Sequence, residues 1–335
     1  MVSTAKAPEA MGLGKEQLLA LYSNMAMARA VGQRERMLNR MGKGPFAVTG
    51  EGHEAAQVGT AFALTPGKDW VLPYYRDIGV ALTIGVTPED LLLAHLGRGT
   101  SIESGGRNMP SHFSNPDLRI VSGSAPVATQ FPHAVGVALA AKIRGLDEVA
   151  MSYVGDGGTS VGDVHEAMNF AGIHKLAVVF VCENNKYAIS VKWDKQSSVE
   201  DVSDRAAGYG FPGVTVDGND VLAVYGAAKE AVGRARRGEG PTFIEAKTYR
   251  LVPHTSDDDD SRYRTREEVA EWTTDKDAIL RHRKWLLDND VATTAEIDAL
   301  QESVNRTVDE ATAAAEAAPM PTPESALRHV YVEEK

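Results

Sequence analysis

The sequence predicts an α/β fold, in which a mostly parallel β-sheet carries helices on both faces and further helices extend the chain at its N- and C-terminal ends. Three observations predict it. Almost continuously apolar runs recur within residues 148–250, as expected for strands that are buried on both faces. Helical segments alternate with these runs. With 335 residues and a hydrophobic fraction of 43%, the chain can bury a large core.

The first half of the chain is predicted to contain two helices and a long loop. Residues 15–41 have apolar residues at helical spacing, and Gly42 ends the pattern. A short helix is predicted over 90–99, after a Thr-Pro start signal. From 100 to 130 the composition shifts to Gly, Ser, Pro and Asn, which predicts a long irregular segment. Segments of this kind inside compact domains are usually functional or disordered.

The second half of the chain supplies most of the predicted sheet. Strands are predicted over residues 148–154, 176–182, 212–218 and 242–250. Helices are predicted over residues 160–173, 220–237, 265–288 and 293–316. The strands come before, between and after the first two of these helices, which is the order of strand–helix–strand units in a parallel sheet.

Composition and charge exclude several classes of protein. The net charge of −11 argues against a protein that coats nucleic acid. Cys182 is the only cysteine, which excludes a disulfide framework and a cysteine-based zinc site, so we expect a reducing, cytoplasmic location. No apolar run reaches the roughly 18 residues of a membrane span. The first ten residues lack the apolar core of a secretory signal.

Two short polar motifs follow neighbouring predicted strands. Gly-Asp-Gly at 155–157 follows one strand and Asn-Asn at 184–185 follows the next, with 26 residues between the motifs. Ligands of open α/β sheets lie beyond the carboxyl ends of the strands, which is where both motifs stand. The helix after Gly-Asp-Gly points free backbone N–H groups at the same place, which suits a phosphate.

Asp156 extends this prediction to a metal ion. A carboxylate about 4 Å from a phosphate oxygen costs several kcal/mol even at a protein-like dielectric constant. A divalent cation between the two groups turns the repulsion into attraction, and magnesium takes its oxygen ligands from one or two side chains, from phosphates and from water. Asn185 offers a side-chain oxygen and Tyr187 a carbonyl oxygen. The motifs together predict one magnesium–diphosphate site.

Other interpretations of the same motifs have less support. Gly-Asp-Gly alone is often a surface turn, and Asn-Asn another. A dinucleotide fingerprint needs a third glycine at position 160, where a serine stands, and no G-x-x-x-x-G-K-[ST] phosphate loop occurs. The pairing of both motifs across one strand–helix–strand unit favours a functional site.

The motifs and their spacing resemble the fingerprint of thiamine-diphosphate enzymes. More narrowly, the chain resembles the α subunit of the two-subunit 2-oxo acid dehydrogenases, and above all of those that act on branched-chain 2-oxo acids. The segments that carry this resemblance are "GEGHEAAQVG" (50–59), "PYYRDIG" (73–79), "SGSAPVATQFPHAVG" (122–136) and "VPHTSDDDDSRYR" (252–264). The resemblance implies the thiamine-diphosphate-binding fold.

The resemblance also assigns roles to individual residues. The residues implied for the cofactor are Tyr75, Arg76, Ala125, Pro126, Val127, Asp156, Gly157, Gly158, Asn185 and His254. The residues implied for magnesium are Asp156, Asn185 and Tyr187, and those matching a potassium site of some members are Ser124, Pro126, Thr129 and Gln130. His254 matches the catalytic histidine of the family, and imidazole is the usual side chain for proton transfer near neutral pH.

The chain departs from the family pattern at several positions. Val252 stands where a glycine is usual, and Glu183 stands where some members place an arginine. The aspartates at 257–260 lack the spacing of a calcium loop, so we expect them to form a solvated, mobile stretch.

Substrate choice depends on one further segment. "GGRNMPSHF" (105–113) resembles a segment of branched-chain 2-oxo acid dehydrogenases. The residues implied to line the substrate pocket are Phe46, Tyr75, Met109 and His112. The implied reaction is thiamine-diphosphate-dependent oxidative decarboxylation with acyl transfer to a lipoyl group. The same chemistry on pyruvate is the alternative, because one or two methylenes are worth only ~1–3 kcal/mol of discrimination.

The resemblance implies partners and a division of the chain. The parts expected are an N-terminal extension and helix (1–45), a diphosphate- and magnesium-binding α/β domain (46–264), and C-terminal helices and a tail packed on the same domain or on a partner (265–335). Thiamine enzymes use two α/β domains and this chain has one, so we expect a β subunit, a heterotetramer and a lipoyl-bearing acyltransferase. An NAD-dependent dehydrogenase and a non-catalytic assembly subunit are the alternatives from other classes.

Overall fold

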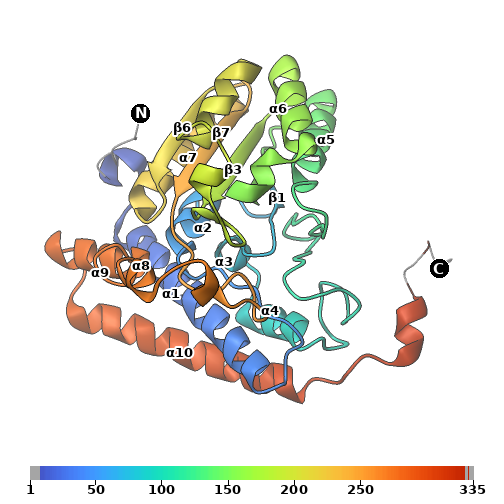
Figure 1. Ribbon diagram of the computed structural model, residues 1–335, viewed down its shortest axis with the longest axis vertical. Helices are drawn as coiled ribbons and strands as arrows, with labels where there is room; N and C mark the ends of the chain where they lie inside the picture. The colour runs from blue at the N-terminus through green and yellow to red at the C-terminus, as the bar shows by residue number, and fades with distance from the viewer. Residues whose placement is uncertain (1–7, 329–330, 332–335) are drawn as a thin grey trace.

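A five-stranded parallel sheet lies at the centre of the computed structural model, which describes residues 8–328 and residue 331 (Figure 1). The strands in spatial order are β1 (Trp70–Leu72), β2 (Ala150–Gly155), β3 (Val178–Asn184), β7 (Thr242–Lys247) and β6 (Gly213–Asp217). Every neighbouring pair is parallel. The predicted fold class is therefore confirmed.

Helices cover both faces of the sheet because its strands are apolar on both sides. In β3, Val178, Phe180 and Cys182 pack with α5 (Gln130–Arg144) and α6 (Gly162–His174). Val179 and Val181 point to the opposite face. The helices packed on that face are α1 (Lys15–Arg40), α2 (Glu54–Ala61), α3 (Ile78–Ile84) and α7 (Val221–Arg236). The side chains of successive strand residues thus build two separate halves of the core.

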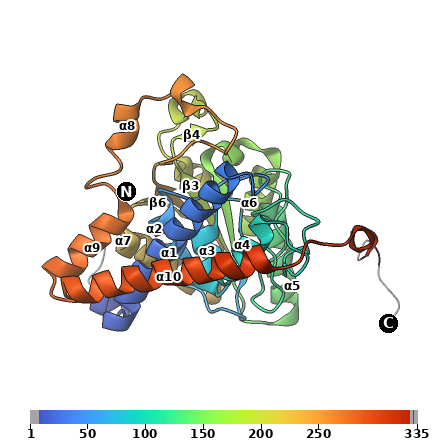
Figure 2. The same cartoon turned by 90° about the horizontal axis from the view of Figure 1, so that it is seen from below.

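The C-terminal helices pack against the N-terminal helix of the same chain. Leu21 and Met25 of α1 share a buried cluster with Leu286, Ile297 and Val304. Figure 2 shows α10 running along this side of the molecule. The elements that pack on α1 in this way are α4 (Pro88–His95), α9 (Ala278–Asp288) and α10 (Thr294–Ala317). The short helix α8 (Arg266–Ala270) lies elsewhere, where Glu268 accepts a hydrogen bond from Tyr187 just beyond the carboxyl end of β3.

Two of the predicted helix starts have the capping contacts that the sequence suggests. The Thr87 hydroxyl accepts a hydrogen bond from the Asp90 backbone N–H, and a proline follows at the first helical position of α4. At the start of α10, Thr293 and Glu296 form a capping box. Each of these contacts satisfies a backbone donor that the helix itself leaves free.

The remaining elements are short and lie mainly around the carboxyl edge of the sheet. They are the hairpin of β4 (Tyr187–Ala188) and β5 (Val191–Lys192) and the 3₁₀ helices η1 (Pro8–Met11), η2 (Asp156–Ser160), η3 (Trp193–Lys195), η4 (Val202–Tyr209), η5 (Asp260–Arg262) and η6 (Pro323–Leu327). Within the described residues, the helices are too short or too polar to cross a membrane. The expectation about a secretory signal concerns mostly residues 1–7, which lie outside the described part.

The structure differs from the predicted elements in two places. The helical segment expected over 265–288 is split into α8 and α9, and the Asp277 carboxylate caps the second helix by accepting from the Ile279 and Leu280 backbone N–H groups. In the first half, α2, α3, α5 and β1 are additional to the predicted elements. All eight residues of α2 are buried, including the polar Glu54, Gln57 and Thr60, so the polar residues of this short helix do not mark a side that faces solvent.

Candidate active site

A cavity of about 430 Å³ lies at the carboxyl ends of β2 and β3. This volume is in the range of small-molecule sites, roughly 300–1,000 Å³. The cavity lies where the segments 74–76, 124–130 and 185–189 and the loop with His254 meet the end of β2 and the turn that follows it. The lining residues are Tyr74, Tyr75, Arg76, Ser124, Ala125, Val127, Ala128, Gln130, Val154, Gly155, Asp156, Gly157, Gly158, Val161, Asn185, Tyr187, Ala188, Ile189 and His254.

Most of the residues expected to form the site line this one cavity. They are Tyr75, Arg76, Ser124, Ala125, Val127, Gln130, Asp156, Gly157, Gly158, Asn185, Tyr187 and His254. The expected site residues that do not line it are Phe46, Met109, His112, Pro126 and Thr129. Of the four expected substrate residues, only Tyr75 reaches the cavity. Met109 is 53% exposed on the irregular segment, away from these walls.

The Gly-Asp-Gly turn is shaped by close packing against its neighbours. A Cβ added to Gly157 would lie 2.6 Å from the Cβ of Ala188, and one added to Gly158 would collide with Val154. Neither these glycines nor Gly155 has a positive φ. The glycines are therefore required because hairpin and strand approach the backbone closely, and the sharp turn expected from the sequence is made with ordinary dihedral angles.

Asp156 places a buried carboxylate in the cavity wall. It stands at the start of η2 and is 1% exposed. Burial raises the pKa of its carboxyl to about 6. Its Oδ2 accepts a hydrogen bond of 2.9 Å from Nε2 of Gln196. A carboxylate that is costly to bury in this way favours a neighbouring cation, which agrees with the expected metal site.

Asn185 presents its amide oxygen on the adjoining strand end. Its Nδ2 lies 3.0 Å from Nε2 of His53, and its Oδ1 accepts from the Tyr187 backbone N–H at 3.1 Å. Both Asn185 and Tyr187 line the cavity together with Asp156. The oxygen atoms expected to bind magnesium are thus gathered on one wall, and hard oxygen donors are what this cation prefers.

Two buried guanidinium groups give the site a positive charge. Arg76 and Arg250 are both essentially buried. Arg76 donates to the carbonyls of Thr49 and His254, and Arg250 donates to the carbonyls of Val252 and Ile189. Among the described residues, neither forms an ion pair with a carboxylate. A buried cation without a counter-ion costs several kcal/mol, so an anion such as a diphosphate fits beside them.

His254 is held as a neutral imidazole. An NH2 group of Arg76 lies 2.8 Å from its Nδ1, and a guanidinium can only donate, so Nδ1 accepts and Nε2 carries the proton. Burial lowers the pKa of His254 to about 3, and the charges of Arg76 and Arg250 add to this effect. In this state His254 offers the cavity a hydrogen-bond donor and is not a base.

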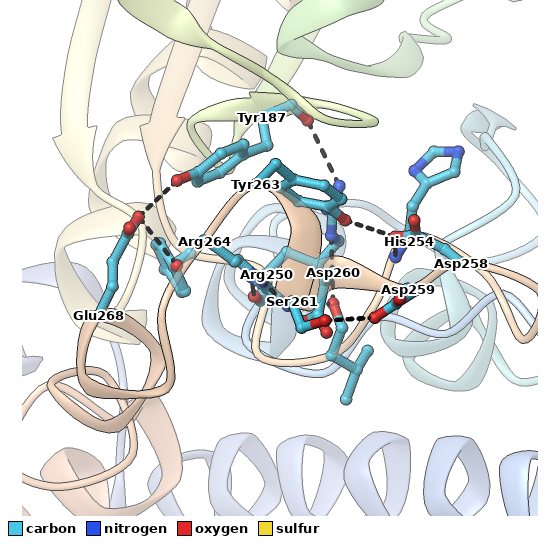
Figure 3. A network of polar contacts seen from close by, with 12 residues as sticks. Tyr187, Arg250, His254, Asp258, Asp259, Asp260, Ser261, Tyr263, Arg264 and Glu268 are labelled. Carbon is cyan, nitrogen blue, oxygen red and sulfur yellow. Dashed lines mark hydrogen bonds and ion pairs between the residues drawn. The ribbon is translucent and has the colours of Figure 1, made fainter.

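The loop that carries His254 is held by a polar network (Figure 3). The Asp258 carboxylate accepts from the His254 backbone N–H at 2.7 Å and from the Tyr263 hydroxyl. The same hydroxyl accepts from Arg250 at 2.8 Å, and Asp260 pairs with Arg264.

The aspartates at 257–260 are therefore not the uniformly solvated stretch that we expected. Asp257 and Asp259 are exposed, whereas Asp258 and Asp260 are partly buried and make internal contacts. Exposed and partly buried aspartates alternate because every second side chain turns inward. There Asp258 accepts from the His254 backbone N–H and the Tyr263 hydroxyl, and Asp260 pairs with Arg264.

Glu183 lies beneath the cavity without lining it. The side chain is buried at the end of β3 and accepts from Gln57 at 3.1 Å and from the Tyr74 hydroxyl at 3.0 Å. Burial raises the pKa of Glu183 to about 7 and raises that of the neighbouring Asp77 carboxyl well above its usual range. Two coupled carboxyl groups in one dry site keep at least one proton.

Reasoning from the sequence did not assign a role to three residues that contact the cavity wall. Arg250 ends a predicted strand, and a polar residue at that sheet edge was a usable signal. His53 lies in one of the resemblance segments, although its contact with Asn185 joins residues far apart in the chain. Gln196 stands in no motif, so no sequence signal indicated its bond to Asp156.

Comparisons with known proteins agree with this geometry. The family model described as "Dehydrogenase E1 component" matches residues 22–324. The chain is 51% identical to 2-oxoisovalerate dehydrogenase subunit alpha of Bacillus subtilis (strain 168) over 96% of this chain and 98% of the relative. It is 44% identical to 3-methyl-2-oxobutanoate dehydrogenase subunit alpha of Mycobacterium tuberculosis (strain ATCC 25618 / H37Rv), over 82% of this chain and 72% of the relative. It is 42% identical to pyruvate dehydrogenase E1 component subunit alpha of Staphylococcus aureus (strain N315), over 82% of this chain and 71% of the relative. The chain therefore belongs to the dehydrogenase E1 component family.

Proposed function

We propose that this chain is the α subunit of a branched-chain 2-oxo acid dehydrogenase. The enzyme decarboxylates a branched 2-oxo acid oxidatively and passes the acyl group to the lipoyl group of an acyltransferase. The observation that carries this proposal is the 51% identity, over nearly the full length of both chains, to a relative named for 2-oxoisovalerate. The relative named for pyruvate is 42% identical over a shorter stretch.

The cavity has the charges that thiamine diphosphate and magnesium require. Arg76 lines the cavity and would supply positive charge for the diphosphate, with the buried Arg250 behind the wall at Ile189, and the glycines of η2 would allow the phosphates to approach the backbone. Asp156, the Asn185 amide and the Tyr187 carbonyl would hold magnesium. When bound, thiamine diphosphate supplies a ring that accepts the electron pair left behind by carbon dioxide.

His254 is the residue of this chain that we propose to act on the reacting groups. It lines the cavity and carries its proton on Nε2, so it can donate a hydrogen bond to the substrate carboxylate or to a lipoyl sulfur. Replacing His254 with Ala should abolish most acyl transfer to the lipoyl group while cofactor binding persists. Unimpaired transfer by this variant would remove the proposed role.

A potassium ion is a further proposal for the segment before α5. The Thr129 hydroxyl lies 3.1 Å from the Pro126 carbonyl, and Ser124 and Gln130 line the cavity nearby. These oxygens are close enough in the chain to surround one monovalent cation. Gln130 already donates to the Tyr153 carbonyl at 2.6 Å, which leaves its side-chain oxygen available. Cofactor binding that is the same in potassium and in tetramethylammonium buffers would argue against this site.

We propose a β subunit and a lipoyl-bearing acyltransferase as partners, in a complex of two α and two β chains. The apolar side chains of Val127 and Ile189 line the cavity and are 52% and 55% exposed, which leaves them suited to contact another chain. A partner there would also exclude water from the reacting groups.

The experiment that tests the function is a substrate comparison with the assembled enzyme. The chain is co-expressed with a β subunit, and kcat/KM is measured for 2-oxoisovalerate and for pyruvate with a lipoyl acceptor. We expect a preference for the branched substrate of roughly tenfold or more, because burying two further methyl groups contributes ~1–3 kcal/mol. A preference for pyruvate would replace the proposed substrate, and no decarboxylation of either would overturn the proposed function.

A further inference from the structure

We propose that Gln196 and His53 are positioning residues that fix which oxygen atoms of Asp156 and Asn185 face the cation, and that they thereby make the site selective for Mg²⁺ over Ca²⁺. The inference rests on the proposed function, because it concerns the cation of the same site. Neither residue lines the cavity or belongs to the ligand set. Each instead forms a hydrogen bond with one of the two ligand side chains, Gln196 with Asp156 and His53 with Asn185.

Gln196 holds one oxygen of the Asp156 carboxylate. Its Nε2 donates to Oδ2 of Asp156 at 2.9 Å and to the Val191 carbonyl at 2.8 Å. Both partners are acceptors, so only the nitrogen of this amide can face them, and its orientation is fixed. The residue is itself held at the end of η3, where its backbone N–H donates to the Trp193 carbonyl. The amide thus ties the hairpin to η2.

This contact favours coordination of a cation through one oxygen of Asp156. The amide holds Oδ2 in place and uses one of its lone pairs, so Oδ1 is the oxygen that is freer to turn toward a cation. Ca²⁺ takes six to eight oxygens and accepts carboxylates through one or both oxygens, whereas Mg²⁺ demands near-ideal octahedral geometry. Fixing the carboxylate in a one-oxygen arrangement therefore favours the smaller cation.

His53 fixes the orientation of the Asn185 amide in the same way. The side chain is fully buried beside the start of α2, and its Nε2 lies 3.0 Å from Nδ2 of Asn185. An amide nitrogen can only donate, so Nε2 of His53 accepts, and the amide oxygen must point away from the ring. That oxygen accepts from the Tyr187 backbone N–H and keeps a second lone pair for the cation.

Residues that orient metal ligands typically change metal affinity by roughly 10–100-fold when they are mutated. A residue that only stabilises the fold has a different signature, because it weakens the binding of both cations together. The ratio of the Ca²⁺ and Mg²⁺ dissociation constants therefore separates the two roles, whereas loss of activity does not.

The test uses the assembled α–β complex with saturating thiamine diphosphate, titrated with MgCl2 or CaCl2 in a calorimeter. For Gln196→Ala we expect Mg²⁺ binding to weaken by roughly 10–100-fold and Ca²⁺ binding much less, so that the preference for Mg²⁺ falls. Gln196→Met has a similar length but no hydrogen-bond donor, so we expect the same fall. Gln301→Ala, which removes an amide far away on α10, is the control and should leave both constants unchanged.

A matched pair of variants tests His53. In His53→Gln the side-chain oxygen can still accept from Asn185, so we expect a near wild-type cation ratio. In His53→Leu the acceptor is lost, and the ratio should fall as for Gln196→Ala. Equal losses for both cations, with a lower melting temperature, would mean that these residues only support the fold. If the wild-type complex shows no magnesium-dependent cofactor binding, the proposed function itself fails.

Discussion

At Nδ1, His254 accepts a hydrogen bond from the Arg76 guanidinium, which also donates to the carbonyl of the same residue. A guanidinium beside an imidazole disfavours the second proton, and burial acts in the same direction. The imidazole therefore stays neutral over the working pH range, with its proton on Nε2. Binding of an anion beside Arg76 would offset part of this effect, which couples the state of His254 to occupancy of the site.

Replacement of Arg76 by Ala tests this coupling. The pKa of His254, lowered to about 3 by burial and by the two arginines, should rise because a nearby positive charge is removed. Loss of a charge-assisted hydrogen bond, worth ~1.5–3 kcal/mol, should weaken cofactor binding roughly tenfold to hundredfold. Histidine hydrogen–deuterium exchange mass spectrometry between pH 3 and 8 reports the titration. Arg98→Ala, outside the cavity, is the control, and an unchanged His254 titration in the Arg76 variant would contradict the argument.

The sequence was informative for residues whose role depends on chain neighbours and uninformative for those that act across the fold. Asp156 and Asn185 follow predicted strands, so the rule about the carboxyl ends of parallel strands brings them together. Gln196 reaches Asp156 across 40 positions, and His53 reaches Asn185 across 132. Contacts of that separation depend on how the hairpin and α2 pack, which no local pattern encodes.

At the scale of elements, the site is a set of loops held by a few polar contacts. The loop that carries His254 is tied to the hairpin through Arg250, which donates to the Ile189 carbonyl and to the Tyr263 hydroxyl. The hairpin and the segment after β7 are tied to α8, because Glu268 accepts from the Tyr187 hydroxyl (Figure 3) and from the Tyr249 hydroxyl. Loss of one such contact should loosen the loop without unfolding the sheet.

Tyr263→Phe removes one hydroxyl that bonds to both Arg250 and Asp258. A buried partner left unsatisfied costs ~1–3 kcal/mol, so we expect local opening of the loop and weaker cofactor binding, with a small change in global stability. Limited proteolysis between residues 255 and 262 measures the opening. Tyr225→Phe is the matched control, because Tyr225 lies in α7 and does not line the cavity. Equal cleavage of both variants would mean that the hydroxyl does not hold the loop.

The glycines of η2 provide a second test at this scale. Gly157→Ala should force the hairpin away from η2, because the added Cβ would lie 2.6 Å from that of Ala188. We expect a loss of ~1–3 kcal/mol in the free energy of unfolding and weaker cofactor binding. Gly136→Ala in α5, where a Cβ meets no atom within 4 Å, should instead stabilise the chain by ~0.5–1 kcal/mol. Denaturant titrations of both variants measure the contrast.

The elements also show where sequence patterns stop being informative. The strand β3 could be predicted because all seven of its residues are buried, so the run is nearly free of polar breaks. The same complete burial hides α2, since it has only eight residues and its polar side chains are buried, so no pattern marks a side that faces solvent. The break between α8 and α9 depends on a new cap at Asp277, which outweighs the helical spacing on either side.

At the scale of the whole molecule, charge and apolar surface are distributed unevenly. The chain carries a net charge of −11, yet Arg76 in the cavity wall and Arg250 behind it are buried and have no ion pair with a carboxylate among the described residues. A positive cavity in an acidic protein concentrates anions at one place. The apolar side chains of Val127 and Ile189 stand at that same place and are more than half exposed.

This arrangement predicts that the partner chain covers the cavity. Val127→Asp and Ile189→Asp each put a charge where the proposed β subunit buries an apolar side chain. Since burial of such a side chain contributes ~1.5–3 kcal/mol, each substitution should weaken α–β association by roughly tenfold or more. Sedimentation analysis of the co-expressed chains measures this association, with Leu280→Asp on α9, 49% exposed and outside the cavity, as the control.

Because these substitutions alter side chains that are already exposed, the isolated α chain should keep its melting temperature. If association is unaffected while the cofactor still binds, the β subunit must contact another face, and the cavity must be closed by a movement of this chain alone.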